Sequence, residues 1–187
     1  MVHMVQNRDN LELEIFLFLI KNKSHLREIS RSLNKPHSTI LRRINILLKE
    51  GVLDYKKEGK NKVFFIKNNL KSKNYIYSAE IYKLSKLIKK CPELGIIFED
   101  IKKAVPKGMI ILFGSYAKEN YKEKSDIDIY IETLNNSVKN KAKNINSKIN
   151  VKIGKFDINS LLIKEIIKNH IIIRGVEEFY EKTKFFG

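Results

Sequence analysis

Two aspartates that lie one residue apart, Asp126 and Asp128, are the side chains whose type and spacing predict chemistry most directly. They begin the segment DIDIYI, in which acidic and apolar residues alternate as in a β-strand. Side chains alternate between the two faces of a strand, so we expect both carboxylates on the same face. Neighbouring carboxylates repel each other unless a cation lies between them. Mg²⁺ is commonly held by one or two carboxylates together with substrate phosphates, so the pair predicts a magnesium site.

A glycine and a serine, Gly114 and Ser115, predict the other half of the same site. They follow the apolar run Met109–Phe113, which has the length of a strand, and precede a short stretch compatible with a helix. A strand-to-helix turn leaves backbone N–H groups free to bind an anion, and glycine lets a phosphate approach the main chain closely. We therefore expect the turn and the aspartates to bind a nucleoside triphosphate that carries Mg²⁺.

The order Gly-Ser, ten residues, Asp-x-Asp, placed between two strand-like runs, resembles the nucleotidyltransferase superfamily that includes DNA polymerase β. The resemblance is greatest to the small, single-domain prokaryotic members, and it extends over roughly residues 93–180. It implies an α-β-α-β-α-β order of elements and binding of the terminal phosphates of ATP by Gly114 and Ser115. It also implies that Asp126 and Asp128 are catalytic and hold Mg²⁺. Lys118 stands where these enzymes often carry a basic residue, which implies a contact with phosphate.

Two positions depart from the pattern of the superfamily. Glu119 stands where a second glycine is usual, so we expect a slightly different turn. The superfamily also places a third carboxylate on the following strand, but the strand expected here, residues 150–154, contains no acid. Asp157 is the nearest candidate for a third metal ligand, and the alternative is that it begins the following helix. Without a third ligand, we expect binding of Mg²⁺ and ATP to survive while transfer becomes slow or is lost.

The first part of the chain predicts three helices followed by a β-hairpin. Apolar residues recur with helical spacing in three successive segments, and we expect Ser24 to cap the second and Pro36 to begin the third. Two β-rich runs then flank a basic loop that contains Gly59. This order of elements resembles the winged helix-turn-helix superfamily over residues 11–68.

Basic and polar side chains on this segment predict an interface with double-stranded DNA. An α-helix fits the major groove, where its N-terminal residues meet base edges, and lysines on a hairpin reach the phosphates. The residues expected to contact DNA are His37, Ser38, Thr39, Arg42 and Arg43 on the third helix, and Lys57, Lys60 and Lys62 on the hairpin. The alternative interpretation is a solvated basic surface on a domain used for protein contacts.

A lysine-rich amphipathic helix is predicted over residues 72–90, before Pro92. We expect its buried stripe to comprise Tyr77, Ile81, Leu84 and Ile88. The pattern favours pairing with its copy in a homodimer, and the alternative is a strut between two domains. We therefore predict an α+β protein with a winged helix-turn-helix domain (residues 1–70), a connecting helix (71–92) and a small nucleotidyltransferase-like α/β domain with a mixed sheet (93–187).

The composition limits the partners and the location of the protein. The chain has 187 residues, with 37 Lys and Arg against 21 Asp and Glu. The resulting net charge of +16 predicts a polyanionic partner, with nucleic acid as the first candidate and an anionic membrane surface as the second. The longest apolar run has six residues, whereas a membrane span needs about 20. Charged residues near the N-terminus argue against a secretory signal, and the single cysteine, Cys91, excludes an internal disulfide. We expect a soluble, cytoplasmic protein.

Three functions fit these features. The first is a DNA-binding enzyme that transfers a nucleoside monophosphate, with AMP from ATP favoured, to a hydroxyl of a partner protein. Small members of the superfamily are associated with protein adenylylation in toxin–antitoxin pairs, so the resemblance implies a toxin-like partner and an antitoxin that represses its own promoter. The second is a transcription regulator whose nucleotidyltransferase-like domain binds nucleotide without catalysis. The third is an RNA-modifying nucleotidyltransferase. We rank it last because no exposed strand is expected to carry the aromatic residues on which RNA bases stack.

Overall fold

The chain divides into two compact units, Met1–Ala79 and Glu80–Gly187, in a computed structural model that describes residues 10–186. The boundary between the units falls inside the long helix α4 (Leu70–Lys90). The charged N-terminal residues that argue against a secretory signal include positions before residue 10, which lie outside the described part. Across residues 10–186, no helix combines the length and the apolar character that a membrane span requires.

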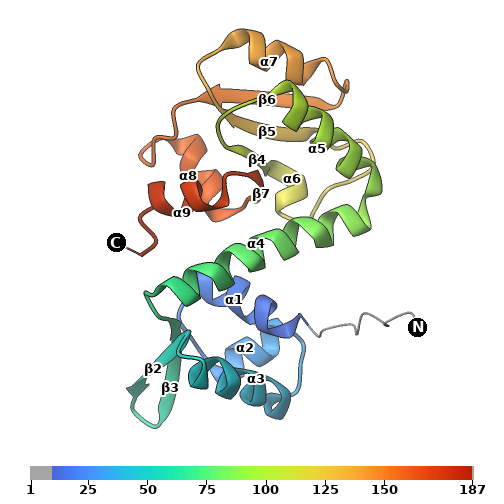
Figure 1. The fold of residues 1–187 in the computed structure, drawn as a ribbon. Helices are drawn as coiled ribbons and strands as arrows, with labels where there is room; N and C mark the ends of the chain where they lie inside the picture. The colour runs from blue at the N-terminus through green and yellow to red at the C-terminus, as the bar shows by residue number, and fades with distance from the viewer. Residues whose placement is uncertain (1–9, 187) are drawn as a thin grey trace, which may run out of the picture. The chain divides into compact units, whose positions relative to one another are not determined.

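The described part of the first unit contains three helices, a three-stranded antiparallel sheet in the order β1-β3-β2, and the first turns of α4 (Figure 1). The elements before α4 are α1 (Leu11–Lys21), β1 (Ser24–His25), α2 (Leu26–Ser32), α3 (His37–Lys49), β2 (Leu53–Glu58) and β3 (Asn61–Ile66). The predicted helices and hairpin are confirmed. The expected cap of the second helix is wrong, because Ser24 lies in β1 and its hydroxyl donates a hydrogen bond to the carboxylate of Glu28.

Apolar stripes of the helices and the inner face of the hairpin form the core of the first unit. The buried apolar side chains include Leu11, Ile15, Phe16 and Leu19 of α1, Ile40, Ile44 and Leu47 of α3, and Leu53, Val63 and Phe64 of the hairpin. Phe16 also stacks on Tyr75 of α4, with 4.9 Å between the ring centroids. This core fixes α3 against α1 and leaves the opposite face of α3 in solvent.

Helix α4 confirms the predicted helix, and Leu84 and Ile88 of its expected stripe are partly buried against the core of the second unit. Ile81, assigned to the same stripe, is 59% exposed. Two polar residues of α4, Ser72 and Glu80, are buried. The Ser72 hydroxyl donates a hydrogen bond to the carbonyl oxygen of Val52 at 3.0 Å. Hydrogen bonds therefore stabilise buried polar side chains at positions of α4 where the spacing of apolar residues does not predict burial.

The second unit contains a four-stranded mixed sheet in the order β6-β5-β4-β7 (Figure 1). Its elements after α4 are α5 (Pro92–Ala104), β4 (Ile110–Phe113), α6 (Gly114–Ala117), β5 (Ile127–Glu132), α7 (Asn136–Lys143), β6 (Ile149–Gly154), α8 (Leu161–Lys168), β7 (Ile171–Arg174) and α9 (Val176–Lys182). Strands β5 and β6 are parallel, whereas β4 is antiparallel to both β5 and β7. The predicted mixed sheet and the α-β-α-β-α-β order, from α5 to β6, are confirmed.

The central strands β4 and β5 are covered on both faces. One face packs with apolar side chains of α5 and α7, and its β5 members are the three isoleucines expected in the core, Ile127, Ile129 and Ile131. The other face of β5 carries Asp128 and Tyr130. The Tyr130 ring contacts Phe156, which in turn contacts Phe179 of α9, at centroid distances of 6.2 and 5.6 Å. Asp128 thus extends from a strand that the core holds firmly.

A buried carboxylate, Glu80, ties the part of α4 within this unit to its C-terminal segment. Glu80 is 1% exposed, and its Oε1 accepts a hydrogen bond from the Tyr180 hydroxyl at 2.8 Å and faces Nε2 of His170 at 3.3 Å. Its Oε2 lies 3.5 Å from Nζ of Lys83. Burial raises the pKa of Glu80, but the hydrogen bond from His170, the charges of Lys83 and His170 and the Tyr180 hydroxyl outweigh it and lower the pKa to about 2.

Candidate functional site

The predicted glycine turn and the second aspartate lie against each other at one end of the sheet. Phe113, the last residue of β4, is paired with Asp128 of β5, and the chain turns directly afterwards at Gly114. Gly114 has a φ of +69°, and a Cβ added to it would lie 2.1 Å from Oδ2 of Asp128. Only glycine fits this position, both for its left-handed backbone and for the space that the carboxylate occupies.

The first aspartate, Asp126, lies just before β5 and is exposed. The backbone enters the strand through a hydrogen bond from the Ile127 N–H to the Lys148 carbonyl at 2.8 Å. The Asp126 carboxylate has no hydrogen-bond or ion-pair partner among the described residues. Strand alternation places it on the side of Asp128, so it is available to a ligand that also contacts Asp128.

An asparagine that sequence reasoning did not single out completes this end of the sheet. Asn150 of β6 lies directly beside Asp128 in the parallel pair, and its Nδ2 donates a hydrogen bond to Oδ1 of Asp128 at 2.8 Å. It is on the strand where the resemblance implies a third carboxylate. The signal that could have found it is its place at the beginning of the predicted strand 150–154. An acid here would repel Asp128, whereas the amide satisfies one of its oxygens.

The geometry does not support Asp157 as a third ligand. Strand β6 runs parallel to β5, from Asn150 beside Asp128 to Gly154 beside Glu132. The four residue steps from Asn150 to Gly154 extend about 13 Å along the strand, and Asp157 follows beyond its far end. Its Oδ1 accepts a hydrogen bond from the Asn159 N–H at 2.9 Å, in the turn before α8. The alternative, that Asp157 begins the following helix, is wrong in its bounds, because α8 begins at Leu161 with Ser160 as its cap.

The turn residues after Gly114 form the short helix α6 and the loop behind it. Ser115 is half-buried within α6, and Nζ of Lys118 forms an ion pair with Oε1 of Glu165 at 2.7 Å. A phosphate contact by Lys118 would therefore compete with Glu165. Glu119 has a φ of +56°, so this turn adopts the left-handed conformation that favours glycine although the residue is glutamate.

The oxygen-rich character of the site fits Mg²⁺ better than a softer metal. Within residues 10–186, no group of three or more His, Cys, Asp or Glu side chains is arranged to hold a metal ion. The candidate ligands are the carboxylates of Asp126 and Asp128, and Asn150 donates a hydrogen bond from Nδ2 to one of the Asp128 oxygens. Mg²⁺ is often bound by one or two carboxylates and completes its ligands with water and substrate phosphates. The residues present fit that mode of binding.

The predicted DNA-facing residues of α3 divide into two groups. His37, Ser38 and Arg42 are exposed. Thr39 is half-buried, and Nη1 of Arg43 is bound to Oε1 of Glu12 at 3.1 Å, which holds that side chain against α1. Sequence reasoning missed other exposed members of the same face, which line a shallow cavity of about 410 Å³ formed by Ser38, Leu41, Arg42, Asn45, Ile46 and Lys49.

The hairpin lysines are exposed and close in register. Lys57 of β2 is paired with Lys62 of β3, and Lys60 follows Gly59 in the two-residue turn. Nζ of Lys62 lies 4.0 Å from the centroid of the Tyr55 ring. Like charges directly opposite each other destabilise an antiparallel pair, so an anion bound here would relieve the repulsion.

Comparison with known proteins decides the family of the second unit. Residues 94–180 match the family described as nucleotidyltransferase domain. A candidate protein adenylyltransferase of Methanocaldococcus jannaschii is 39% identical over 84 residues, which cover 41% of this chain and 67% of that protein. The chain belongs to the nucleotidyltransferase family. The superfamily expected from the Gly-Ser and Asp-x-Asp spacing is confirmed, and the region matched by the nucleotidyltransferase family includes the turn, both aspartates and Asn150.

The contact between Gly114 and Asp128 generates a stability prediction for this nucleotidyltransferase. Replacing Gly114 by Ala should lower the free energy of unfolding by at least about 2 kcal/mol, because the left-handed backbone and the carboxylate both oppose a Cβ. Gly154→Ala is the control, since nothing lies within 4 Å of a Cβ added there, and its effect should stay within about 0.5 kcal/mol. Urea unfolding of both variants measures the difference, and equal effects would contradict the close approach.

Proposed function

We propose that this nucleotidyltransferase transfers AMP from ATP, with Mg²⁺, to a hydroxyl group of a partner protein. The observation that carries the proposal is the approach of the Gly114 turn to Asp128, which brings a phosphate-binding backbone and a metal-binding carboxylate to one place. The relative from M. jannaschii, whose name gives it as a candidate protein adenylyltransferase, supports ATP as donor and a protein as acceptor.

Each side chain then has a distinct role. The backbone N–H groups at Gly114 and the hydroxyl of Ser115 bind the terminal phosphates, and Lys118 adds a positive charge when it leaves Glu165. Asp126 and Asp128 hold Mg²⁺. When bound, the metal neutralises charge on the triphosphate and favours in-line attack at the α-phosphorus.

Transfer forms a bond between the acceptor oxygen and the α-phosphorus and breaks the bond to pyrophosphate, which leaves. The acceptor hydroxyl must also lose its proton. Asn150, which stands on the strand beside Asp128, has no group that takes up a proton at neutral pH. We therefore propose that the proton passes to water and that turnover is slow compared with a site that has a third carboxylate.

A second function, nucleotide sensing without transfer, is favoured by the same asparagine. If two carboxylates suffice to bind Mg²⁺ and ATP but not to activate an acceptor, the domain would report nucleotide to a regulatory partner. The position of Asp157, beyond the far end of β6, supports this alternative because it supplies no replacement for the third acid.

ATP labelled at the α-phosphate separates the two functions. We expect wild type with Mg²⁺ and host lysate to label a protein band, and Asp126→Asn to label none, because the substitution removes one metal-binding charge. The exposed position of Asp126 predicts that the variant keeps its thermal stability. Absence of label with wild type, while calorimetry still detects binding of ATP with Mg²⁺, would contradict transfer and favour sensing. Label on an RNA band instead would contradict a protein acceptor.

We also propose that the first unit is a winged helix-turn-helix domain that binds double-stranded DNA. Support comes from the exposed face of α3 and from the paired hairpin lysines Lys57 and Lys62. A homodimer that reads two half-sites fits such a domain. Joined to a transferase with a protein acceptor, DNA binding fits an antitoxin that modifies a toxin-like partner and represses its own promoter.

Two neighbouring arginines give this proposal a matched test. Arg42 is exposed on α3, so Arg42→Ala should weaken binding to the promoter by about tenfold without changing the melting temperature. Arg43 is bound to Glu12, so Arg43→Ala should cost about 1 kcal/mol of stability and leave DNA affinity nearly unchanged. Mobility shifts and thermal unfolding measure both effects. The reverse assignment, or binding that does not differ from random DNA, would contradict sequence-specific binding through this face.

A further inference from the structure

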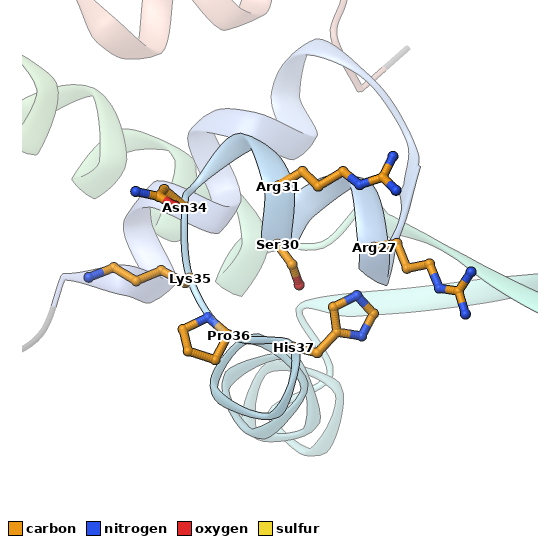
Figure 2. A pocket seen from close by; sticks show the side chains of 7 residues that line it. All are labelled: Arg27, Ser30, Arg31, Asn34, Lys35, Pro36 and His37. Carbon is orange, nitrogen blue, oxygen red and sulfur yellow. The ribbon is translucent and has the colours of Figure 1, made fainter.

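A basic cavity lies between α2 and α3, and it shares His37 with the residues of α3 already assigned to DNA. Its volume is about 650 Å³, and it is lined by Arg27, Ser30, Arg31, Asn34, Lys35, Pro36 and His37 (Figure 2). Arg27, Arg31 and Lys35 are exposed and are not among the residues that the sequence assigned to DNA. The cavity therefore brings three additional positive charges beside the beginning of α3.

Within the described part of the chain, these charges are not neutralised. None of the acidic side chains described there lines the cavity. Arg27, Arg31 and Lys35 have no ion-pair partner among residues 10–186. The acid of α2 nearest in sequence, Glu28, has its carboxylate hydrogen-bonded by the Ser24 hydroxyl. Uncompensated positive charges around an open cavity attract an anion.

The arrangement of the side chains favours an extended anion over a small one. Figure 2 shows Arg27 and Arg31 reaching to one side of the cavity and Lys35 to the other, so their charged ends do not converge on one point. Ser30, 5% exposed, donates its hydroxyl hydrogen to the Leu26 carbonyl at 2.9 Å rather than into the cavity. A compact phosphate would find no enclosed set of donors, whereas a row of phosphates would meet the charges in turn.

We propose that the cavity between α2 and α3 binds backbone phosphates of duplex DNA, and that Arg27, Arg31 and Lys35 position the duplex without reading its sequence. The proposal rests on DNA binding by the first unit. Duplex DNA carries one negative charge for about every 1.7 Å of its axis. Such a row of phosphates can reach positively charged side chains that lie on both sides of the cavity. Arginines suit this task because the guanidinium group binds phosphate through two parallel hydrogen bonds.

The experiment compares two double variants of the full chain that remove the same charge. Arg27→Ala with Arg31→Ala removes the cavity arginines, and Lys141→Ala with Lys143→Ala removes two exposed lysines of α7 in the other unit. Fluorescence anisotropy with a labelled 30-base-pair duplex, of promoter and of scrambled sequence, gives Kd over a series of salt concentrations. A calorimetric titration with inorganic phosphate alone tests for a small-anion site.

We expect the arginine variant to bind both duplexes at least tenfold more weakly at low salt, and the slope of log Kd against log salt to fall by about 1.8, since each phosphate contact contributes about 0.9. The lysine variant should stay within twofold of wild type. If wild type binds DNA and the arginine variant does not differ from it, the cavity proposal fails and DNA binding stands. If wild type binds neither duplex, both fail. Inorganic phosphate that binds wild type below millimolar concentration, but not the arginine variant, would show a small-anion site and overturn the proposal.

Discussion

The contact between a glycine backbone and a carboxylate is the constraint on which the second unit depends. Antiparallel pairing of β4 and β5 sets Phe113 opposite Asp128, and the turn at Gly114 then passes so close to the carboxylate that a single added carbon would overlap it. The same contact brings together the turn that we propose binds phosphate and the aspartate that we propose binds Mg²⁺. The surrounding core, with β5 buried between two layers of side chains, holds both in place before any ligand arrives. Preorganisation of this kind reduces the cost of binding a charged nucleotide.

Asn150 separates binding from transfer in this account. Its amide stabilises Asp128 by a hydrogen bond of 2.8 Å, where a carboxylate would repel it in the absence of metal. The proposed site therefore carries two acids, which in our proposal hold Mg²⁺ together with a nucleotide, and a neutral neighbour that neither adds charge nor takes up a proton. Asn150 in place of an acidic residue is compatible with both proposed functions, a slow transferase and a nucleotide sensor. They differ only in whether an acceptor reacts during the lifetime of the complex.

Local patterns predicted much of this structure, and long-range hydrogen bonds account for most of the differences. Strand alternation correctly placed the β5 isoleucines in the core, because it depends only on neighbouring residues. Helical periodicity did not predict partners that are distant in sequence, such as Glu12, which binds Arg43, and the Val52 carbonyl, which accepts a hydrogen bond from Ser72. Asp157 was a poor candidate because closeness in sequence did not bring it close to Asp128. It follows β6 closely in sequence, but it lies past the end of that strand farther from Asp128.

The melting temperature of the Asn150→Asp variant, measured with and without Mg²⁺, tests most directly whether Asn150 stands at a metal site beside Asp128. In EDTA the new carboxylate should repel Asp128 and lower the melting temperature, and millimolar Mg²⁺ should restore it and raise AMP transfer at least tenfold over wild type. Asn140→Asp, on the exposed side of α7, controls for the added charge, and its melting temperature should be the same in EDTA and in Mg²⁺. A variant whose melting temperature is unchanged in EDTA and insensitive to Mg²⁺ would contradict the account.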